Sequence, residues 1–353
     1  MKKLLAVLLA TAMVLGLAAC GSTATATTTA APAATEAPAA TEAAAKKLLD
    51  KPIVFKVSYV ENPDTAMGTI MPKAFKKAQE LCNDEVQFEF YPSAQLGNEA
   101  DVMEQISNGA PIIGVAGYDD MSATVPACIP LAVPYVFESI EEVCNFGKSD
   151  YFKELQKQME SSGFVPMCSG SLGVRHFIST CPITCADDIK GKIIRMGNSN
   201  PCQSFITAIG GTPATTAWAD NYSLLQTGAI DGCEAALDTL YSSSLYEVCT
   251  NLCLSGHLCT PFMFVTSPEN WNKIPAEYQK LIIEALSEGT EELAKKLDED
   301  SPMYVQKFKD AGVEVCENPD VASFREYTLK EYDYLGIDRS EYDKIREAIK
   351  SVM

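Results

Sequence analysis

The residues that could support covalent or acid–base chemistry are few, and they form no familiar catalytic pattern. The sequence has no G-x-S-x-G nucleophile turn, no G-x-x-x-x-G-K-[ST] phosphate loop and no H-E-x-x-H zinc motif. Its two histidines, His176 and His257, lie far apart and give little scope for general-base catalysis, although carboxylates could substitute. A glycine-rich segment at 210–213 follows a predicted helix, which is the wrong side for a dinucleotide-binding loop. The pattern favours binding over catalysis, and we predict that the protein is not an enzyme.

The N-terminus has the pattern of an export signal. Two lysines precede an apolar run from Leu4 to Leu17, which is too short for a comfortable membrane span. The run ends in L-A-A-C-G around Cys20, which resembles a bacterial lipobox; a plain signal peptide or a short anchor helix is the alternative. We therefore predict a lipoprotein signal peptide at 1–19 and a lipid anchor on Cys20. The folded body would then lie at the extracytoplasmic face of a bacterial cell membrane.

The segment that follows the predicted anchor has low complexity. Residues 20–48 are rich in Ser, Thr, Ala, Pro and Glu and offer almost nothing to bury. Such a segment cannot offset the entropy lost on ordering, so it is predicted to be a flexible linker between the membrane and the folded body.

Cysteine is abundant, with thirteen residues in the chain. Twelve remain if Cys20 carries lipid, and an even number in an exported protein is compatible with disulfides. Several lie in apolar runs, however, where a free cysteine behaves as a small hydrophobic side chain. Both interpretations stay open, and buried thiols are favoured. The spacings Cys181-x3-Cys185 and Cys249-x3-Cys253 differ from those of a zinc ribbon, so we predict no structural metal and no cofactor.

Composition and charge limit the class of protein further. The 353 residues are 47% hydrophobic and 21% charged, as in globular proteins, and a body of about 300 residues usually divides into two lobes. The net charge is −19, from 28 basic and 47 acidic residues, and no basic stripe is present. Nucleic acid is therefore excluded as a partner, whereas a local cationic pocket could still bind a small anion.

The spacing of apolar residues predicts the elements of the first lobe. Strand patterns occupy 52–59, 86–91 and 112–115, and helical patterns occupy 67–82 and 99–107. This β-α-β-α-β order predicts a parallel sheet wrapped by helices.

The remaining elements follow from the same patterns and from proline and glycine positions. They are strands at 163–168 and 174–179 near a crossover, a strand at 192–196, helices at 201–209, 221–227 and 235–241, a strand at 262–266, and a helix from Pro275 to Asp310 bent near Pro302.

The most informative stretch is 187–236. It contains I-K-G-K-I-I-R at 189–195, I-G-G-T-P at 209–213 and Y-S-L-L-Q-T-G-A-I-D-G-C-E at 222–234. This ordered set resembles the DctP-like family of TRAP-transporter solute-binding proteins, which shows a K-G-x-K-I-R strand, a G-x-x-P step and an L-Q-T-G-x-x-D-G-x-E segment. Further matches are P-S-A-Q-L-G at 92–97, V-P-Y-V-F at 133–137, G-H at 256–257 and W-x-x-I-P at 271–275.

The resemblance implies an α/β, two-lobed periplasmic-binding-protein-like fold with crossover strands, an interlobe ligand cleft and a long helix along both lobes. On this basis lobe I comprises 49–172 with 261–300, and lobe II comprises 173–260 with 301–353. It also implies that the lobes close on a small carboxylate and deliver it to membrane permease subunits driven by an ion gradient.

The resemblance further implies a set of ligand-binding residues. Arg195 is the position of an arginine that forms a two-pronged salt bridge with the ligand carboxylate, which suits a planar, permanently charged guanidinium; a surface arginine is the alternative. Arg175 matches a second ligand-contacting arginine, and Trp218 matches an aromatic wall. The other implied positions, each with a structural alternative, are Ser58, Glu99, Tyr118 and Glu234. His257 is predicted to be a hydrogen-bonded structural histidine.

The sequence departs from the family at one point. Many members follow the residue matched by Glu234 with Asn-Pro, whose Asn contacts the carboxylate, whereas Ala235 and Ala236 stand here and Cys233 replaces a common Gln. This departure weakens the case for sialic acid or a C4-dicarboxylate as the ligand. The rival functions are a binding protein of another importer, a sensory module, and a lipid-anchored cell-surface enzyme.

Overall fold

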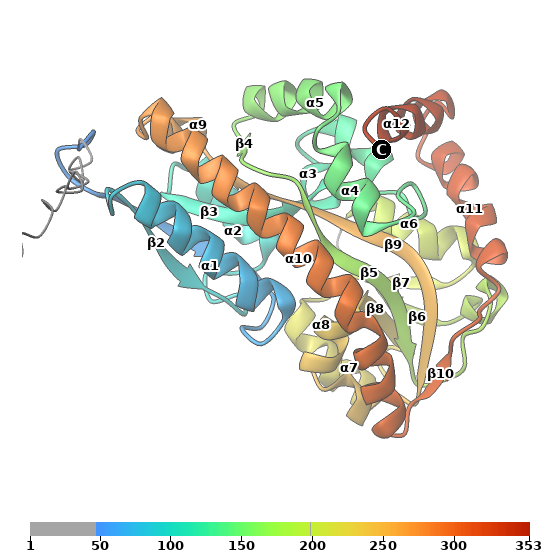
Figure 1. Ribbon diagram of the computed structural model, residues 1–353. Helices are drawn as coiled ribbons and strands as arrows, with labels where there is room; N and C mark the ends of the chain where they lie inside the picture. The colour runs from blue at the N-terminus through green and yellow to red at the C-terminus, as the bar shows by residue number, and fades with distance from the viewer. Residues whose placement is uncertain (1–46, 198) are drawn as a thin grey trace, which may run out of the picture. The chain divides into compact units, whose positions relative to one another are not determined.

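The computed structural model describes residues 47–353 except 198 (Figure 1). The predicted signal peptide, the lipidation site at Cys20 and nearly all of the predicted linker lie outside the described residues. The described residues belong to one unit, Ala45–Met353.

The strands of this unit form one mixed sheet of ten strands. They are β1 (Ile53–Ser58), β2 (Val86–Tyr91), β3 (Ile112–Gly117), β4 (Val165–Pro166), β5 (Gly170–Ser179), β6 (Ile193–Arg195), β7 (Thr212–Ala214), β8 (Gly232–Ala236), β9 (Asn251–Thr266) and β10 (Glu314–Cys316). The order is β2-β1-β3-β9-β5-β8-β6-β7, and β4 and β10 each pair with β9. Each predicted strand is present, although β5 and β9 begin earlier than predicted.

The β-α-β-α-β order of the first part is confirmed. Strand β1 lies between β2 and β3 and is parallel to both. The connecting helices are α1 (Ala66–Leu81) and α2 (Glu99–Ser107). Each begins where a side chain caps it, because Thr65 accepts a hydrogen bond from the Gly68 amide and Asn98 forms a reciprocal capping box with Asp101.

Strands β5 and β9 are the crossover strands of the sheet. The second half of β9 pairs antiparallel with β3, as at Val265 opposite Gly114, whereas its first half pairs with β5, as at Leu252 opposite Ile178. Strand β9 therefore runs without interruption from one group of strands to the other (Figure 1). The predicted crossover is confirmed, and the early start of β9 was missed because its first residues alternate polar and apolar types less clearly.

One predicted helix begins later than expected. The helix predicted from Ala235 is instead the end of β8, and α8 (Leu237–Ser242) follows it. Strand β8 pairs with both β5 and β6, so its backbone groups are satisfied by two neighbours. Small residues such as Ala235 and Ala236 have good helix propensity, but their pairing with His176 and Arg175 of β5 overrides that preference.

The helices cover the two faces of the sheet (Figure 1). Beyond α1, α2 and α8 they are α3 (Tyr118–Met121), α4 (Ile140–Phe146), α5 (Asp150–Ser161), α6 (Asn200–Ile209), α7 (Asn221–Thr227), α9 (Pro268–Trp271), α10 (Ala276–Asp310), α11 (Val321–Tyr334) and α12 (Ser340–Lys350), with 3₁₀ turns at 126–131, 186–189, 218–220 and 245–247. No pattern predicted α3, α4, α5, α9, α11 or α12. Within the described part of the chain, no helix combines the length and the apolar character needed to cross a bilayer.

Helix α10 packs against elements from several parts of the unit. It has 35 residues, contains Pro302 without interruption, and packs against α1, β5 and α8. Its contact with α1 is close, because a Cβ added at Gly289 would lie 2.5 Å from the Cβ of Ala74. The predicted long helix is confirmed.

Candidate ligand-binding site

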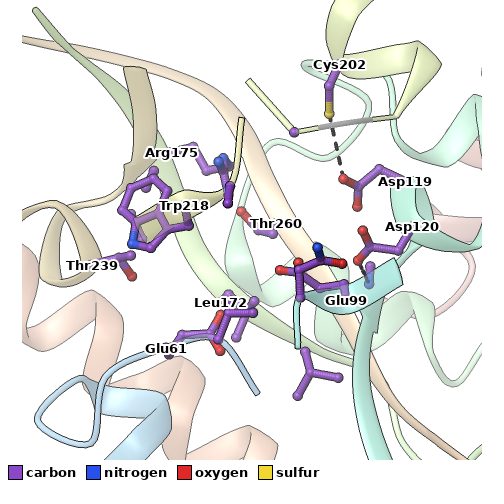
Figure 2. Close-up of a pocket in the computed structure, with 18 of the residues that line it drawn as sticks. Glu61, Glu99, Asp119, Asp120, Leu172, Arg175, Cys202, Trp218, Thr239 and Thr260 are labelled. Atoms are coloured by element: carbon purple, nitrogen blue, oxygen red, sulfur yellow. Dashed lines mark hydrogen bonds between the residues drawn. The ribbon is translucent and has the colours of Figure 1, made fainter. Parts of the chain in front are cut away.

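A cavity of about 410 Å³ lies where the ends of several strands converge (Figure 2). One wall comes from residues that follow β1 and β3 and from the start of α2, and the other from β5, β6, the segment 215–218 and α8. Its volume falls within the range of about 300–1,000 Å³ that is usual for small-molecule sites. Ligands of open α/β sheets bind beyond the carboxyl ends of the strands, which is the place of this cavity.

Arg195 is the last residue of β6 and points its guanidinium into the lining of the cavity. The residue is 9% exposed, and its Nε and Nη2 donate to the carbonyl oxygen of Thr216 at 3.1 and 2.8 Å. The guanidinium carbon lies 5.5 Å from the centre of the Trp218 ring. Burial lowers the pKa of Arg195, and Glu234 opposes that effect, so the group stays charged. Among the described residues it forms no ion pair with a carboxylate.

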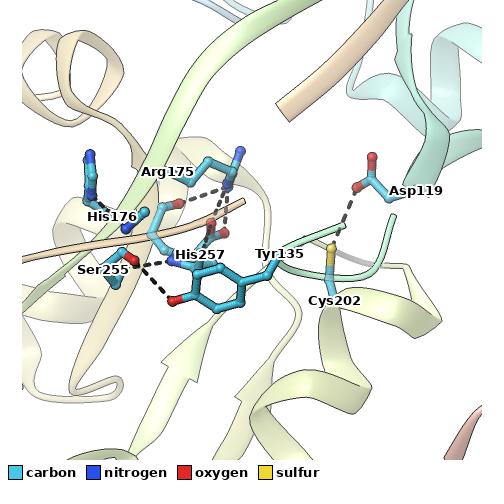
Figure 3. Close-up of polar contacts among 9 residues, drawn as sticks. Asp119, Tyr135, Arg175, His176, Cys202, Ser255 and His257 are labelled. Carbon is cyan, nitrogen blue, oxygen red and sulfur yellow. Dashed lines mark hydrogen bonds and ion pairs between the residues drawn. The ribbon is translucent and has the colours of Figure 1, made fainter. Parts of the chain in front are cut away.

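Arg175 on β5 also lines the cavity, but its charge is already paired. Its Nε and Nη2 donate to the two carboxylate oxygens of Glu234, and Nη2 donates to the Glu234 carbonyl at 2.8 Å (Figure 3). Glu234 is 1% exposed. Although burial alone would raise the pKa of Glu234, the guanidinium of Arg175 lowers it to about 2. The pair is therefore ionised and fixes the orientation of Arg175.

A buried polar chain continues behind this pair (Figure 3). His257 Nε2 lies 3.3 Å from Glu234 Oε2, and its Nδ1 lies 2.8 Å from the hydroxyl of Ser255. The imidazole stacks on Phe177 with ring centres 4.3 Å apart. Tyr135 donates from its hydroxyl to the Ser255 carbonyl at 3.0 Å. The predicted structural role of His257 is confirmed. The series of hydrogen bonds from His257 through Ser255 to Tyr135 supports the Arg175–Glu234 ion pair on the side of Glu234.

Carboxylates line the other side of the cavity. They are Glu61 after β1, Glu99 at the start of α2, and Asp119 and Asp120 in α3 (Figure 2). Asp120 accepts from the Gly117 amide at 2.8 Å, and Asp119 lies 3.7 Å from the thiol of Cys202. We call these four side chains the acidic wall.

Glu61 is the most buried member of the acidic wall. It is 8% exposed, and its Oε2 has no hydrogen-bond partner among the described residues. Burial raises the pKa of Glu61 to about 7, and the nearby Glu99 and Asp238 add to the effect. The hydroxyl of Thr260, on the central strand β9, is likewise buried without a partner among the described residues and lines the same cavity.

The comparisons with known proteins decide the family. Residues 57–337 match the family described as bacterial extracellular solute-binding protein, family 7. The chain belongs to this family. As a member of this solute-binding family, it is a binding protein of a TRAP transporter rather than an enzyme.

Three similar proteins illustrate the relationship. The C4-dicarboxylate-binding periplasmic protein DctP of Rhodobacter capsulatus is 26% identical over 272 residues, which cover 75% of this chain and 80% of the relative. The sialic acid-binding periplasmic protein SiaP of Vibrio cholerae is 26% identical over 259 residues, covering 72% and 80%. A TRAP periplasmic solute-binding protein of Actinobacillus succinogenes with bound L-galactonate has a TM-score of 0.80 at 27% identity, covering 85% and 100%. The two-lobed α/β fold predicted for this solute-binding protein is thereby confirmed.

The structure brings together four of the residues predicted to bind ligand. Arg195, Arg175, Trp218 and Glu99 all line the cavity of this family 7 protein. Their convergence gives one side a guanidinium and an aromatic ring and the other side a carboxylate. This arrangement can hold a small polar molecule.

The other three predicted residues do not line the cavity. Ser58 is 2% exposed within β1, and Tyr118 is fully buried against Phe137 and Phe146. Because successive residues at a strand end or helix start point in different directions, Tyr118 enters the core while the next two aspartates face the cavity. Glu234 does not reach the cavity, because its carboxylate is held by the guanidinium of Arg175.

Sequence reasoning missed Glu61, Asp119, Asp120 and Thr260. A usable signal existed for the first three, because each follows a predicted parallel strand, and residues at such carboxyl ends face the ligand crevice. Thr260 lies inside β9 and only the crossing of that strand brings it to the cavity.

Of the cysteines in the described part of the chain, Cys202 lines the cavity. All twelve cysteines of the described chain are free thiols, and eight are buried. No group of three or more His, Cys, Asp or Glu side chains among the described residues is arranged to hold a metal ion.

Proposed function

We propose that this protein captures a small carboxylate through Arg195, closes its two lobes around it, and presents it to the permease subunits of an ion-gradient-driven TRAP transporter. The observation that carries the proposal is the state of Arg195. Its guanidinium is nearly buried at the cavity, where it donates to the Thr216 carbonyl oxygen and lies over the Trp218 ring. A charge without a carboxylate partner in such a place is ready for a ligand carboxylate.

The names of similar proteins support an acidic ligand. The Rhodobacter relative is named for C4-dicarboxylates, the Vibrio relative for sialic acid, and the Actinobacillus protein holds L-galactonate. These three molecules share a carboxylate and differ in the rest of the structure. A common arginine for the shared group and a variable opposite wall would explain both facts.

Closure of the lobes is supported by a contact between α1 of the proposed lobe I and α8 of the proposed lobe II. Asp238 in α8 accepts a hydrogen bond from the amide of Ala66, the first residue of α1, at 3.1 Å. Helix N-termini favour a negative partner, so this contact stabilises the arrangement in which α8 and α1 approach each other. We propose lobe I as 49–172 with 261–300 and lobe II as 173–260 with 301–353.

The membrane attachment of the protein is part of the proposal. Cys20 stands at the end of an L-A-A-C-G segment that has the form of a lipobox. Mass spectrometry of protein extracted from a bacterial membrane fraction should find the mature N-terminus at Cys20 with attached acyl chains. A Cys20→Ala variant should leave the membrane fraction, and an unlipidated mature protein would disprove the anchor.

The carboxylate site is tested by a ligand screen with matched variants. The mature body is screened by thermal shift against mono-, di-, hydroxy-, keto- and amino-carboxylates, since a ligand that binds the folded state raises its melting temperature. Arg195→Ala should lower the affinity for the tightest-binding ligand by at least about tenfold, because a buried charged hydrogen bond is lost.

Arg339→Ala provides the control, since Arg339 pairs with Asp333 at an exposed site and is not among the residues that line the cavity. Its affinity for the ligand should equal that of the natural protein. Unchanged affinity in Arg195→Ala, measured by calorimetry, would remove Arg195 from the site.

A further inference from the structure

The charges that line the cavity do not suit a purely anionic ligand. Glu61, Glu99, Asp119 and Asp120 form the acidic wall, and Figure 2 shows Glu99, Asp119 and Asp120 on the side away from Arg175 and Trp218. Among the described residues, no member of the wall forms an ion pair with Lys, Arg or His. The wall thus has four acidic groups and no cation of its own.

The two arginines do not compensate for the acidic wall. Arg175 already has its charge matched by Glu234, whose two carboxylate oxygens accept hydrogen bonds from the Arg175 guanidinium. Arg195 contributes one positive charge, and a ligand carboxylate would neutralise it. An anionic ligand would therefore leave the acidic wall unmatched, and like charges held close together in a partly desolvated cavity repel one another.

Two buried acceptors that lack partners point to a group of the ligand. Glu61 and Thr260 are each 8% exposed and line the cavity, and Glu61 Oε2 and Thr260 Oγ1 have no hydrogen-bond partner among the described residues. A buried acceptor without a partner costs about 1–3 kcal/mol, and more if it is charged. A donor brought by the ligand would remove that cost.

We propose that the ligand is a zwitterion, whose carboxylate meets Arg195 and whose cationic nitrogen group, an ammonium or an amidinium, lies against Glu61 and the rest of the acidic wall. This inference rests on the proposed function, since it assumes the carboxylate contact with Arg195. An organic cation fits better than a bound metal ion, because the described residues contain no cluster with the geometry of a metal site. A nitrogen cation needs only acceptors around it, without fixed coordination.

The groups around Glu61 make this recognition sensitive to pH. Facing it are Glu99 from α2, Asp120 from α3, Asp238 from α8 and Arg175 from β5, and of these four only Arg175 favours its ionised form. With a pKa of about 7, Glu61 is partly protonated at neutral pH in the free protein. A bound cation lowers that pKa, so binding near neutral pH releases protons, and the affinity for a zwitterion falls as the pH falls below 7.

The test uses pairs of probes that differ in one group. Aliphatic amino-carboxylates with three to six carbons are each compared with the hydroxy-carboxylate of the same skeleton, by calorimetry on the mature protein in two buffers of different ionisation enthalpy. We expect at least one amino member to bind about tenfold or more tightly than its hydroxy partner, with proton release, as a buried charge pair would give.

Two variants locate the effect. Glu61→Gln should reduce the preference for the amino member by about tenfold while keeping the fold, because it removes a charge but retains the shape. Glu104→Gln makes the same charge change on the exposed face of α2, outside the cavity lining, and should leave the preference unchanged. Arg195→Ala should lower the affinity for both the amino-carboxylate and the hydroxy-carboxylate of a probe pair.

The outcomes separate this inference from the function on which it rests. Equal or tighter binding of the hydroxy members would overturn the zwitterion and leave a site for hydroxy acids. Binding that disappears on adding a chelator would overturn it in favour of a metal-bridged acid. Retained binding of all probes in Arg195→Ala would instead overturn the carboxylate contact itself.

Discussion

The buried pair of Arg175 and Glu234 allows a quantitative prediction for Glu234→Gln. The carboxylate of Glu234 accepts from the guanidinium with both oxygens and lies 3.3 Å from His257 Nε2. Its pKa of about 2, against an ordinary value of 4.5, means that the folded protein favours its ionised form by roughly two and a half pKa units. At about 1.4 kcal/mol per unit, this corresponds to about 3 kcal/mol of folding stability.

The assay is urea unfolding of the natural protein and the variant at a series of pH values. At pH 7 the Glu234→Gln variant should lose about 3 kcal/mol, because it leaves a buried guanidinium without its counter-charge. The folded pKa is lower than the unfolded one, so this stability is present above pH 4.5 and is lost as the pH falls toward 2. The difference between the two proteins should therefore shrink over that interval.

Glu138→Gln is the matched control for this experiment. Glu138 also pairs with an arginine, Arg325, at 2.9 Å, but the two side chains are 45% and 43% exposed. An exposed pair contributes about 0–1 kcal/mol, so the control should change little. Equal losses from Glu234→Gln and Glu138→Gln would refute the reasoning that burial makes the Arg175–Glu234 pair strong.

Three further predictions concern the rest of the fold. Glu331 is fully buried, and burial raises its pKa to about 8, so stability should fall as the pH rises from 4.5 to 8 and Glu331→Gln should remove that slope in urea unfolding. Gly289→Ala places a methyl group against Ala74 of α1 and should lower stability by about 1–3 kcal/mol, measured by calorimetric melting. Asp238→Ala removes the acceptor for the Ala66 amide and should increase the radius of gyration of the ligand-bound protein in small-angle X-ray scattering; an unchanged radius would exclude Asp238 from closure.

Sequence patterns correctly predicted the helices and strands that are stabilised by interactions within the element itself. Helix α2 was predicted over its full length, since Asn98 and Asp101 cap it and its apolar residues have helical spacing. Strands β1 and β2 were predicted for a similar reason, because β-branched and aromatic residues alternate along them. The mistaken start of α8 at Ala235 has the opposite origin, since pairing of this part of β8 with β5 overrode the helix propensity of alanine.

By itself the sequence determined the family and the crossover α/β fold, because these depend on ordered motifs and on local periodicity, and the same motifs led to the proposal for Arg195. Only the tertiary structure decided that Arg175 is matched by Glu234, and that Glu61, Asp119 and Asp120 share one cavity with Thr260. These residues are far apart along the chain, and their interactions act over a few ångströms. Which charge is paired and which is left for a ligand is therefore set by how the strands cross, and no spacing in the sequence records it.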